Sequence, residues 1–144
     1  MSPKQILNGM AERAAQLNDT LAVRKDEFRE LMVSFGKTVT AGEKGSKAVL
    51  DLTTFELHFV GLLFRFVHRP SLNMKSHFVE IHQRIEDINA AVAVWRHVGT
   101  LEIADGTVAD DEGHRHRLDS VEAAALPLWV RVFNAVDNPN GNLS

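Results

Sequence analysis

Apolar residues at helical spacing run through the first quarter of the chain. They follow each other at steps of three and four residues, which places them on one face of an α-helix; the positions are Leu7, Met10, Ala14, Leu17, Leu21, Phe28, Leu31 and Phe35. Arg24 is the polar residue at a position of this series, and Ser2 with Gln5 forms a capping box at its start. The pattern predicts one helix of about 34 residues, or about 50 Å. Gly36 is expected to end it, and Asn18–Thr20 is the stretch where it could break, because such residues compete for backbone hydrogen bonds.

A second series with the same spacing follows Pro70 and ends at Gly99. Its positions are Met74, Phe78, Ile81, Ile85, Ile88, Val92 and Trp95. The series predicts a second long helix at residues 72–98. Heptad patterns of this kind pack helix against helix, either inside one chain or as a coiled coil between chains. Arg24 favours pairing between chains, because a lone polar residue in such a series commonly sets partner and register. We therefore expect self-association into a homo-oligomer.

Two strongly apolar segments, residues 55–67 and 121–133, resemble each other. Glu56 aligns with Glu122, Leu62 with Leu128, and Arg65 with Arg131; these are the three identities in the comparison. Each segment follows a predicted helix and a glycine-containing region, residues 36–50 and 99–118, that is expected to form a hairpin or a loop with short strands. We hypothesise an internal duplication, with half-repeats 1–69 and 70–144 inside a single domain of residues 1–144.

The secondary structure of these two segments is ambiguous when each is taken alone. Residues 55–59 alternate between apolar and polar side chains, which suits a strand, but the apolar positions of the first segment also fit a helix. The second segment begins with Asp119 or Ser120 as a cap and continues with alanines, which favours a helix. If the two share a fold, both are helices in which Gly61 and Pro127 mark a bend or a break; a strand at residues 128–133 is the alternative.

These elements predict a mainly α fold of the α+β class. It has two long heptad-patterned helices, each followed by a hairpin-like loop and a shorter apolar helix. The composition agrees with a globular protein: 44% of the 144 residues are hydrophobic and 24% are charged. The size is ordinary for one domain.

Charge and cysteine content exclude several classes of function. The formal net charge of −3 gives no electrostatic reason to bind nucleic acid. The chain has no cysteine, which excludes disulfides, thiolate zinc sites and a cysteine nucleophile and fits a reducing compartment. No signal peptide is recognisable, and residues 55–67 are too short and too polar to span a membrane. We expect a cytoplasmic protein with neither a membrane span nor a nucleic-acid partner.

The histidines offer the only candidate chemistry. Glu56 with His58 and Glu80 with His82 are two residues apart, whereas a di-metal helical bundle needs Glu-x-x-His so that both ligands face inward. A more interesting cluster lies at residues 110–117, where two histidines share one face of an extended segment and acidic residues could add a third metal ligand. The weak metal candidates are His114, His116, Asp110 and Asp111. A solvated loop tip is the commoner meaning of such a cluster, so we predict no catalytic residue, no cofactor and no metal.

The sequence therefore predicts a non-enzymatic assembly or interaction protein that acts through helical surfaces. It would be a structural subunit of a larger particle, or an inhibitor or immunity-type binder. The alternative is a helical bundle that senses a small ligand or a metal through His114 and His116. The predicted interface consists of Phe78, Ile81, Ile85, Ile88, Val92, Trp95, Phe59, Leu62 and Phe66.

Overall fold

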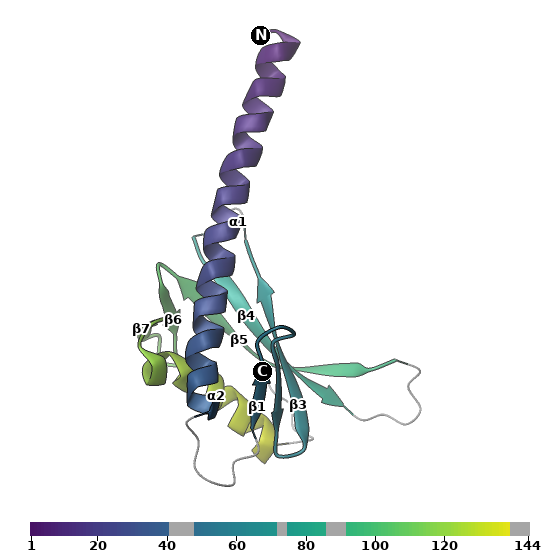
Figure 1. Ribbon diagram of the computed structural model, residues 1–144, viewed down its shortest axis with the longest axis vertical. Helices are drawn as coiled ribbons and strands as arrows, with labels where there is room; N and C mark the ends of the chain where they lie inside the picture. Colours follow the sequence, from purple (N-terminus) through teal and green to yellow (C-terminus); the bar gives the residue numbers. More distant parts are fainter. Residues whose placement is uncertain (41–47, 72–74, 86–91, 139–144) are drawn as a thin grey trace.

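A computed structural model describes residues 1–40, 48–71, 75–85 and 92–138. In these ranges two helices pack against a seven-stranded sheet (Figure 1). The helices are α1 (Pro3–Thr40) and α2 (Val121–Asp137), and the strands are β1 (Val49–Asp51), β2 (Glu56–Phe59), β3 (Leu62–Arg69), β4 (His77–Ile85), β5 (Val94–Ala104), β6 (Thr107–Ala109) and β7 (Arg115–Arg117). Strand order equals chain order, every pair is antiparallel, and the sheet curls into a half-barrel. The predicted fold of two long helices with repeats is wrong.

Helix α1 confirms the first half of the prediction and corrects its end. The backbone N–H of Ser2 donates to Gln5 Oε1 at 2.9 Å, and that of Gln5 donates to Ser2 Oγ at 3.3 Å, so the capping box is present. The helix runs without a break through Asn18–Thr20 and continues past Gly36 to Thr40. A glycine inside a helix costs about 1 kcal/mol, a penalty that packing in the body of the protein easily outweighs.

The second predicted long helix is wrong, because its residues form strands β4 and β5. Residues 86–91, which include Ile88, lie outside the described part. Along β4 the side chains of His77, Val79, Ile81 and Gln83 are buried and those between them are less so, which is the period of a strand. Positions three residues apart, such as Phe78 and Ile81, therefore lie on opposite faces of the sheet. Several of these residues are β-branched and favour strands, so a heptad series of apolar residues was not specific for a helix.

The two apolar segments adopt different structures, so the internal duplication is wrong. Residues 56–69 form the hairpin β2–β3, in which Phe59 pairs with Leu62 across a turn at Val60 and Gly61. Both turn residues have positive φ, 49° and 76°, as a two-residue type I′ turn requires. Residues 121–137 form helix α2, as predicted, and the helix runs through Pro127; the alternative of a strand at 128–133 is wrong.

The glycine-containing regions are partly as expected. Strands β5 and β6 form a hairpin whose turn residues, Asp105 and Gly106, have φ values of 50° and 71°. Gly99, which was expected to end a helix, lies within β5, where a Cβ atom would stand 2.8 Å from Cδ of Arg131 on α2. Because Gly99 has no side chain, the side chain of Arg131 can lie against the sheet at this position. The other region contains the end of α1 and the short strand β1, and residues 41–47 lie outside the described part.

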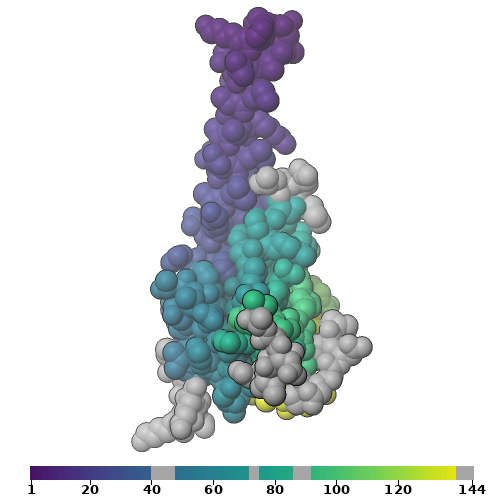
Figure 2. All heavy atoms as spheres, turned by 90° about the vertical axis from the view of Figure 1, so that its right-hand side faces the viewer, coloured from purple at the N-terminus to yellow at the C-terminus, as the bar shows by residue number. Residues whose placement is uncertain are grey.

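The core lies where both helices meet the sheet. The ring of Phe35 on α1 has its centroid 5.1 Å from that of Phe66 on β3 and 4.8 Å from that of Trp129 on α2. The Trp129 indole N–H donates to Thr38 Oγ1 at 2.8 Å and ties the two helices together. The largest fully buried side chains come from both helices and most strands: Phe35, Phe64, Leu31, Met32, Leu57, Ile81, Ile103, Leu118, Leu128, His77, Val79 and Val108. Only the C-terminal half of α1 takes part in this core, and the other half projects from the body (Figure 2).

Candidate functional site

The projecting half of α1 is the largest surface feature of the molecule (Figure 1). Every residue from 1 to 16 is exposed, and Arg24 is the first fully buried residue along the helix. The exposed fractions of the apolar side chains are large: 48% for Ile6, 65% for Leu7 and 64% for Met10. Leu7 and Met10 belong to the same stepwise series that is buried further along the helix, and Ile6 is next to Leu7 in the sequence. A helix of this length gains little from propensity alone in water, and its stability usually comes from packing of its apolar face.

A chain of polar side chains fastens the other half of α1 to the sheet. Glu27 on α1 faces two histidines of the sheet interior: its Oε1 lies 3.1 Å from His77 Nε2, and His77 Nδ1 lies 2.8 Å from His68 Nε2. The second oxygen, Oε2, accepts the backbone N–H of Gly106 at 2.7 Å. The ring of His68 stacks on Phe28 with a centroid distance of 4.9 Å. Helix α1, strands β3 and β4 and the β5–β6 turn are thus joined by one set of hydrogen bonds.

The directions of these hydrogen bonds follow from the chemistry of the groups. Burial lowers the pKa of His77 more than the hydrogen bond and the negative charge of Glu27 raise it. Burial, followed by the neighbouring His77, lowers the pKa of His68 to about 4. Both rings are therefore neutral near pH 7, and each has one N–H. A carboxylate only accepts, so His77 donates from Nε2 to Glu27, and His68 Nε2 donates to His77 Nδ1. The N–H of His68 is therefore on Nε2, and its Nδ1 is an acceptor.

Sequence reasoning missed this arrangement. The sequence analysis singled out none of Glu27, His68 and His77. The signal that could have found it is period-two burial: on a strand, His77 shares a face with Val79 and Ile81 and so points into the core. Which carboxylate would meet it could not be read from the sequence, because Glu27 is 50 residues away.

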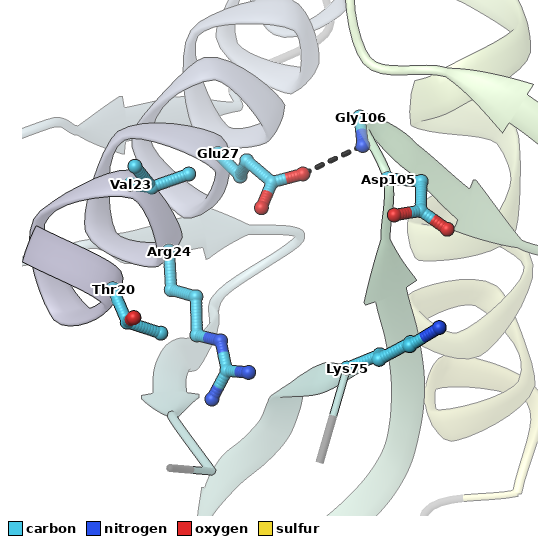
Figure 3. A pocket seen from close by; sticks show the side chains of 7 residues that line it. All are labelled: Thr20, Val23, Arg24, Glu27, Lys75, Asp105 and Gly106. Carbon is cyan, nitrogen blue, oxygen red and sulfur yellow. Dashed lines mark hydrogen bonds between the residues drawn. The ribbon is translucent and has the colours of Figure 1, made fainter. Parts of the chain in front are cut away.

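An open pocket of about 390 Å³ lies beside Glu27, where α1 leaves the body (Figure 3). Its lining residues are Thr20, Val23, Arg24, Glu27, Lys75, Asp105 and Gly106. Arg24 and Lys75 supply positive charge, and Glu27 and Asp105 supply negative charge. The pocket therefore has no excess of either sign. Arg24, which the sequence placed in the apolar series of α1, is 7% exposed and belongs to the face that meets the sheet.

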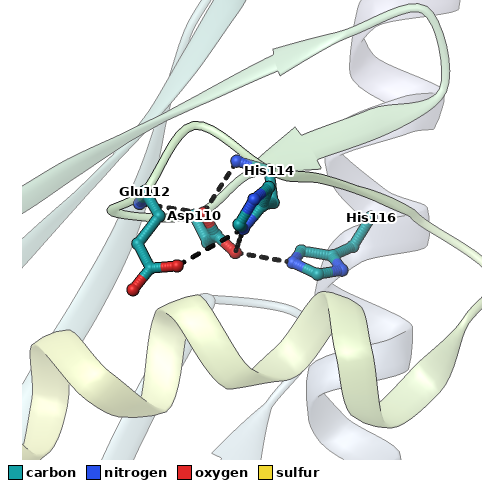
Figure 4. Close-up of polar contacts among 4 residues, drawn as sticks. All are labelled: Asp110, Glu112, His114 and His116. Atoms are coloured by element: carbon teal, nitrogen blue, oxygen red, sulfur yellow. Dashed lines mark hydrogen bonds and ion pairs between the residues drawn. The ribbon is translucent and has the colours of Figure 1, made fainter.

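Three of the weak metal candidates, Asp110, His114 and His116, lie close together in the loop at residues 110–117. The two histidines face the carboxylate of Asp110 (Figure 4). Asp110 Oδ2 lies 2.8 Å from His116 Nε2 and 3.7 Å from His114 Nδ1. Asp110 Oδ1 accepts the backbone N–H groups of Glu112 and His114, both at 2.9 Å. The hydrogen bond from His116 and those from the backbone lower the pKa of Asp110. Asp111 is separate from this group and pairs with Arg131 of α2.

The hydrogen bonds of Asp110 account for the folded conformation of this loop. Among the described residues no group of three or more histidine, aspartate or glutamate side chains is placed to hold a metal ion. Both oxygens of Asp110 take part in hydrogen bonds within the loop, Oδ2 with the His116 ring and Oδ1 with the backbone N–H of His114. The alternative of a metal sensor therefore gains no support from the loop.

The described residues of the predicted interface are distributed over the sheet instead of along two helices. Ile81 and Phe66 lie in the core, 0% and 3% exposed, while Phe59 and Leu62 are partly buried against it. Phe78 lies under the guanidinium of Arg69, and Trp95 under that of Arg65, at 5.1 and 4.1 Å from the ring centroids. Ile85 and Val92 are exposed, and Ile88 lies outside the described residues. Their predicted arrangement as a helical seam is wrong.

The comparisons with known proteins found no protein-family model, no curated protein and no solved structure that matches this chain. No helix in the described part of the chain is long and apolar enough to cross a membrane.

Proposed function

We propose that this chain is a non-enzymatic assembly protein that associates with copies of itself through the projecting half of α1. The observation that carries the proposal is the exposure of residues 1–16 in a helix whose apolar series continues the one buried against the sheet. Monomeric proteins seldom leave such a stripe uncovered, and exposed apolar stripes mark interaction sites. The surface proposed here is helical, as the sequence analysis expected of the interface. It lies on α1, however, and not in the segments where the interface was predicted.

The rest of the molecule suits a supporting role for this surface. The Glu27–His77–His68 chain and the contacts of Phe35 hold the base of α1 rigidly against the sheet. A helix fixed at its base presents its free half in one direction, which lowers the entropy lost on binding. The hydrogen bonds of Glu27 to His77 and to the backbone N–H of Gly106, and that between His77 and His68, give these residues a structural role.

The exposed half also has little that would oppose self-association. Residues 3–21 contain two basic side chains, Lys4 and Arg13, and two acidic ones, Glu12 and Asp19. Two copies of a segment with balanced charge do not repel each other strongly. The apolar side chains, in contrast, gain free energy by leaving water.

The test is the molar mass in solution of two matched double variants. In Leu7→Glu/Met10→Glu the new carboxylates lie in the apolar stripe, and in Asn8→Glu/Ala15→Glu they lie on the opposite face of the same turns; both add the same charge. We expect wild type and Asn8→Glu/Ala15→Glu to be oligomeric at micromolar concentration by light scattering. The stripe variant should be monomeric with unchanged circular dichroism of the sheet. A monomeric wild type, or equal masses for the two variants, contradicts the proposal.

A further inference from the structure

We infer that two copies of the chain pair through residues 3–21 of α1 in antiparallel orientation. The two-fold axis crosses the pair at the height of residue 12. This rests on the self-association proposed above and adds the orientation and the register. Two properties of α1 carry it: the position of the body relative to the stripe, and the sizes of the side chains along the stripe.

The body of the protein blocks a parallel pair. Phe28, Leu31 and Phe35 continue the exposed series of Leu7 and Met10, and they are buried against the sheet and α2. A straight helix drifts by only about 20° per heptad relative to such a series, so the exposed and the buried parts of the stripe lie on the same side of α1. Two parallel helices joined along this side would place both sheets in the same space. The body lies at the C-terminal end of α1 (Figure 1). In an antiparallel pair the two bodies would therefore lie at opposite ends.

The antiparallel register matches side chains along the whole exposed stripe. With the axis beside Glu12, Leu7 faces the partner's Leu17, and Met10 faces the partner's Ala14. A large residue thus meets a small one next to the axis, and two leucines meet further out. A parallel pair in register would set Ala14 against the partner's Ala14 and leave a thin layer in the middle. The overlap of 19 residues corresponds to about 28 Å of helix.

The overlap ends where the body begins. Level with Leu21 the partner's helix reaches Pro3, and beyond this point lies the pocket that Arg24, Glu27, Lys75 and Asp105 line (Figure 3). The exposed length of α1 therefore equals the length that an antiparallel partner can cover before it meets the sheet.

Engineered cysteines test the orientation without interference, because the chain has none of its own. A disulfide needs Cα atoms within about 7 Å of each other. In the antiparallel pair Leu7→Cys meets only Leu17→Cys, so each single variant stays uncrosslinked on oxidation, and a mixture of the two yields a covalent dimer on a non-reducing gel. A mixture of Asn8→Cys with Ala15→Cys, on the opposite face, controls for collisions. Met10→Cys mixed with Ala14→Cys repeats the test one layer closer to the axis.

Each outcome is decisive. Crosslinking in the two stripe mixtures, without crosslinking of the single variants, is the expected result. Covalent dimers of Leu7→Cys alone or Leu17→Cys alone overturn the antiparallel orientation but leave self-association intact. A dimeric wild type in which neither single variants nor stripe mixtures crosslink shows that pairing uses another surface. A monomeric wild type overturns the proposed function itself.

Discussion

At the scale of single residues, burial fixes the protonation of the histidines that join α1 to the sheet. The pKa of His68 falls to about 4 and that of His77 also falls, chiefly because burial penalises the charged rings. In the unfolded chain both rings return to an ordinary value near 6.5. As the pH falls below about 6.5, the unfolded chain takes up protons that the folded protein does not. The free energy of unfolding therefore decreases from about pH 6.5 down to about pH 4.

Replacing His68 should flatten this part of the pH dependence. His68→Phe keeps an aromatic ring against Phe28 but cannot be protonated. It should be less stable than wild type at pH 7 by about 1 kcal/mol, because His77 Nδ1 loses its donor. Between pH 7 and pH 4.5 it should then lose on the order of 1–2 kcal/mol less stability than wild type, as measured by urea titration. His58→Phe, at an exposed position on β2, is the control; an unchanged pH dependence of His68→Phe would speak against a neutral, buried His68.

At the scale of elements, the turn between β2 and β3 contains a residue that fits it badly. Val60 has φ of 49° in a type I′ turn, a conformation that Asn, Asp and Gly adopt readily and that a β-branched residue adopts only with strain. The hairpin was hard to predict from the sequence because a valine before Gly61 is not a turn signal. The pairing of Phe59 with Leu62 and the packing of Phe64 and Phe66 hold the turn in place.

Val60→Asn should stabilise the protein by about 1 kcal/mol, because the strain at this position disappears while the exposed side chain gives up few contacts. Thermal and urea unfolding measure the difference. Val49→Asn is the matched control: Val49 is similarly exposed but lies in strand β1, where asparagine is disfavoured, and this variant should be slightly less stable than wild type. A loss of stability on Val60→Asn would contradict a strained turn.

At the scale of the whole molecule, one core connects the two helices and the sheet. Phe35 of α1 contacts both Phe66 of β3 and Trp129 of α2, and Trp129 also donates a hydrogen bond to Thr38 of α1. Removing α2 from this core would uncover the apolar side of α1, and removing α1 would uncover the sheet. We therefore expect the predicted single domain to unfold as one cooperative unit.

Fluorescence and circular dichroism should report the same unfolding transition. In Trp95→Phe the remaining tryptophan, Trp129, reports on the contact between α2 and α1, while circular dichroism reports on all helices and strands. The two midpoints in urea should coincide at one protein concentration. An earlier fluorescence midpoint would mean that α2 leaves the sheet before the sheet unfolds, and that the chain has two units.

The elements that the sequence alone determined are those whose signals are local. Helix α1 follows from its capping box and its regular apolar series, α2 from its alanines and its cap region, and the β5–β6 turn from Asp105 and Gly106. Each of these depends on residues within a few positions of one another, so no knowledge of the rest of the fold was needed.

Only the tertiary structure decided between helix and strand at residues 55–69, 77–85 and 94–104. Their apolar positions fit both periods, and the choice depends on hydrogen bonds to strands elsewhere in the chain, such as those that join β3 to β4. The same holds for the polar connection, since Glu27 meets His77 and Gly106 only once α1 lies across the sheet. Whether a stretch of the apolar series on α1 is core or surface was likewise set by where the sheet ends, because burial is a property of the assembled molecule and not of the helix.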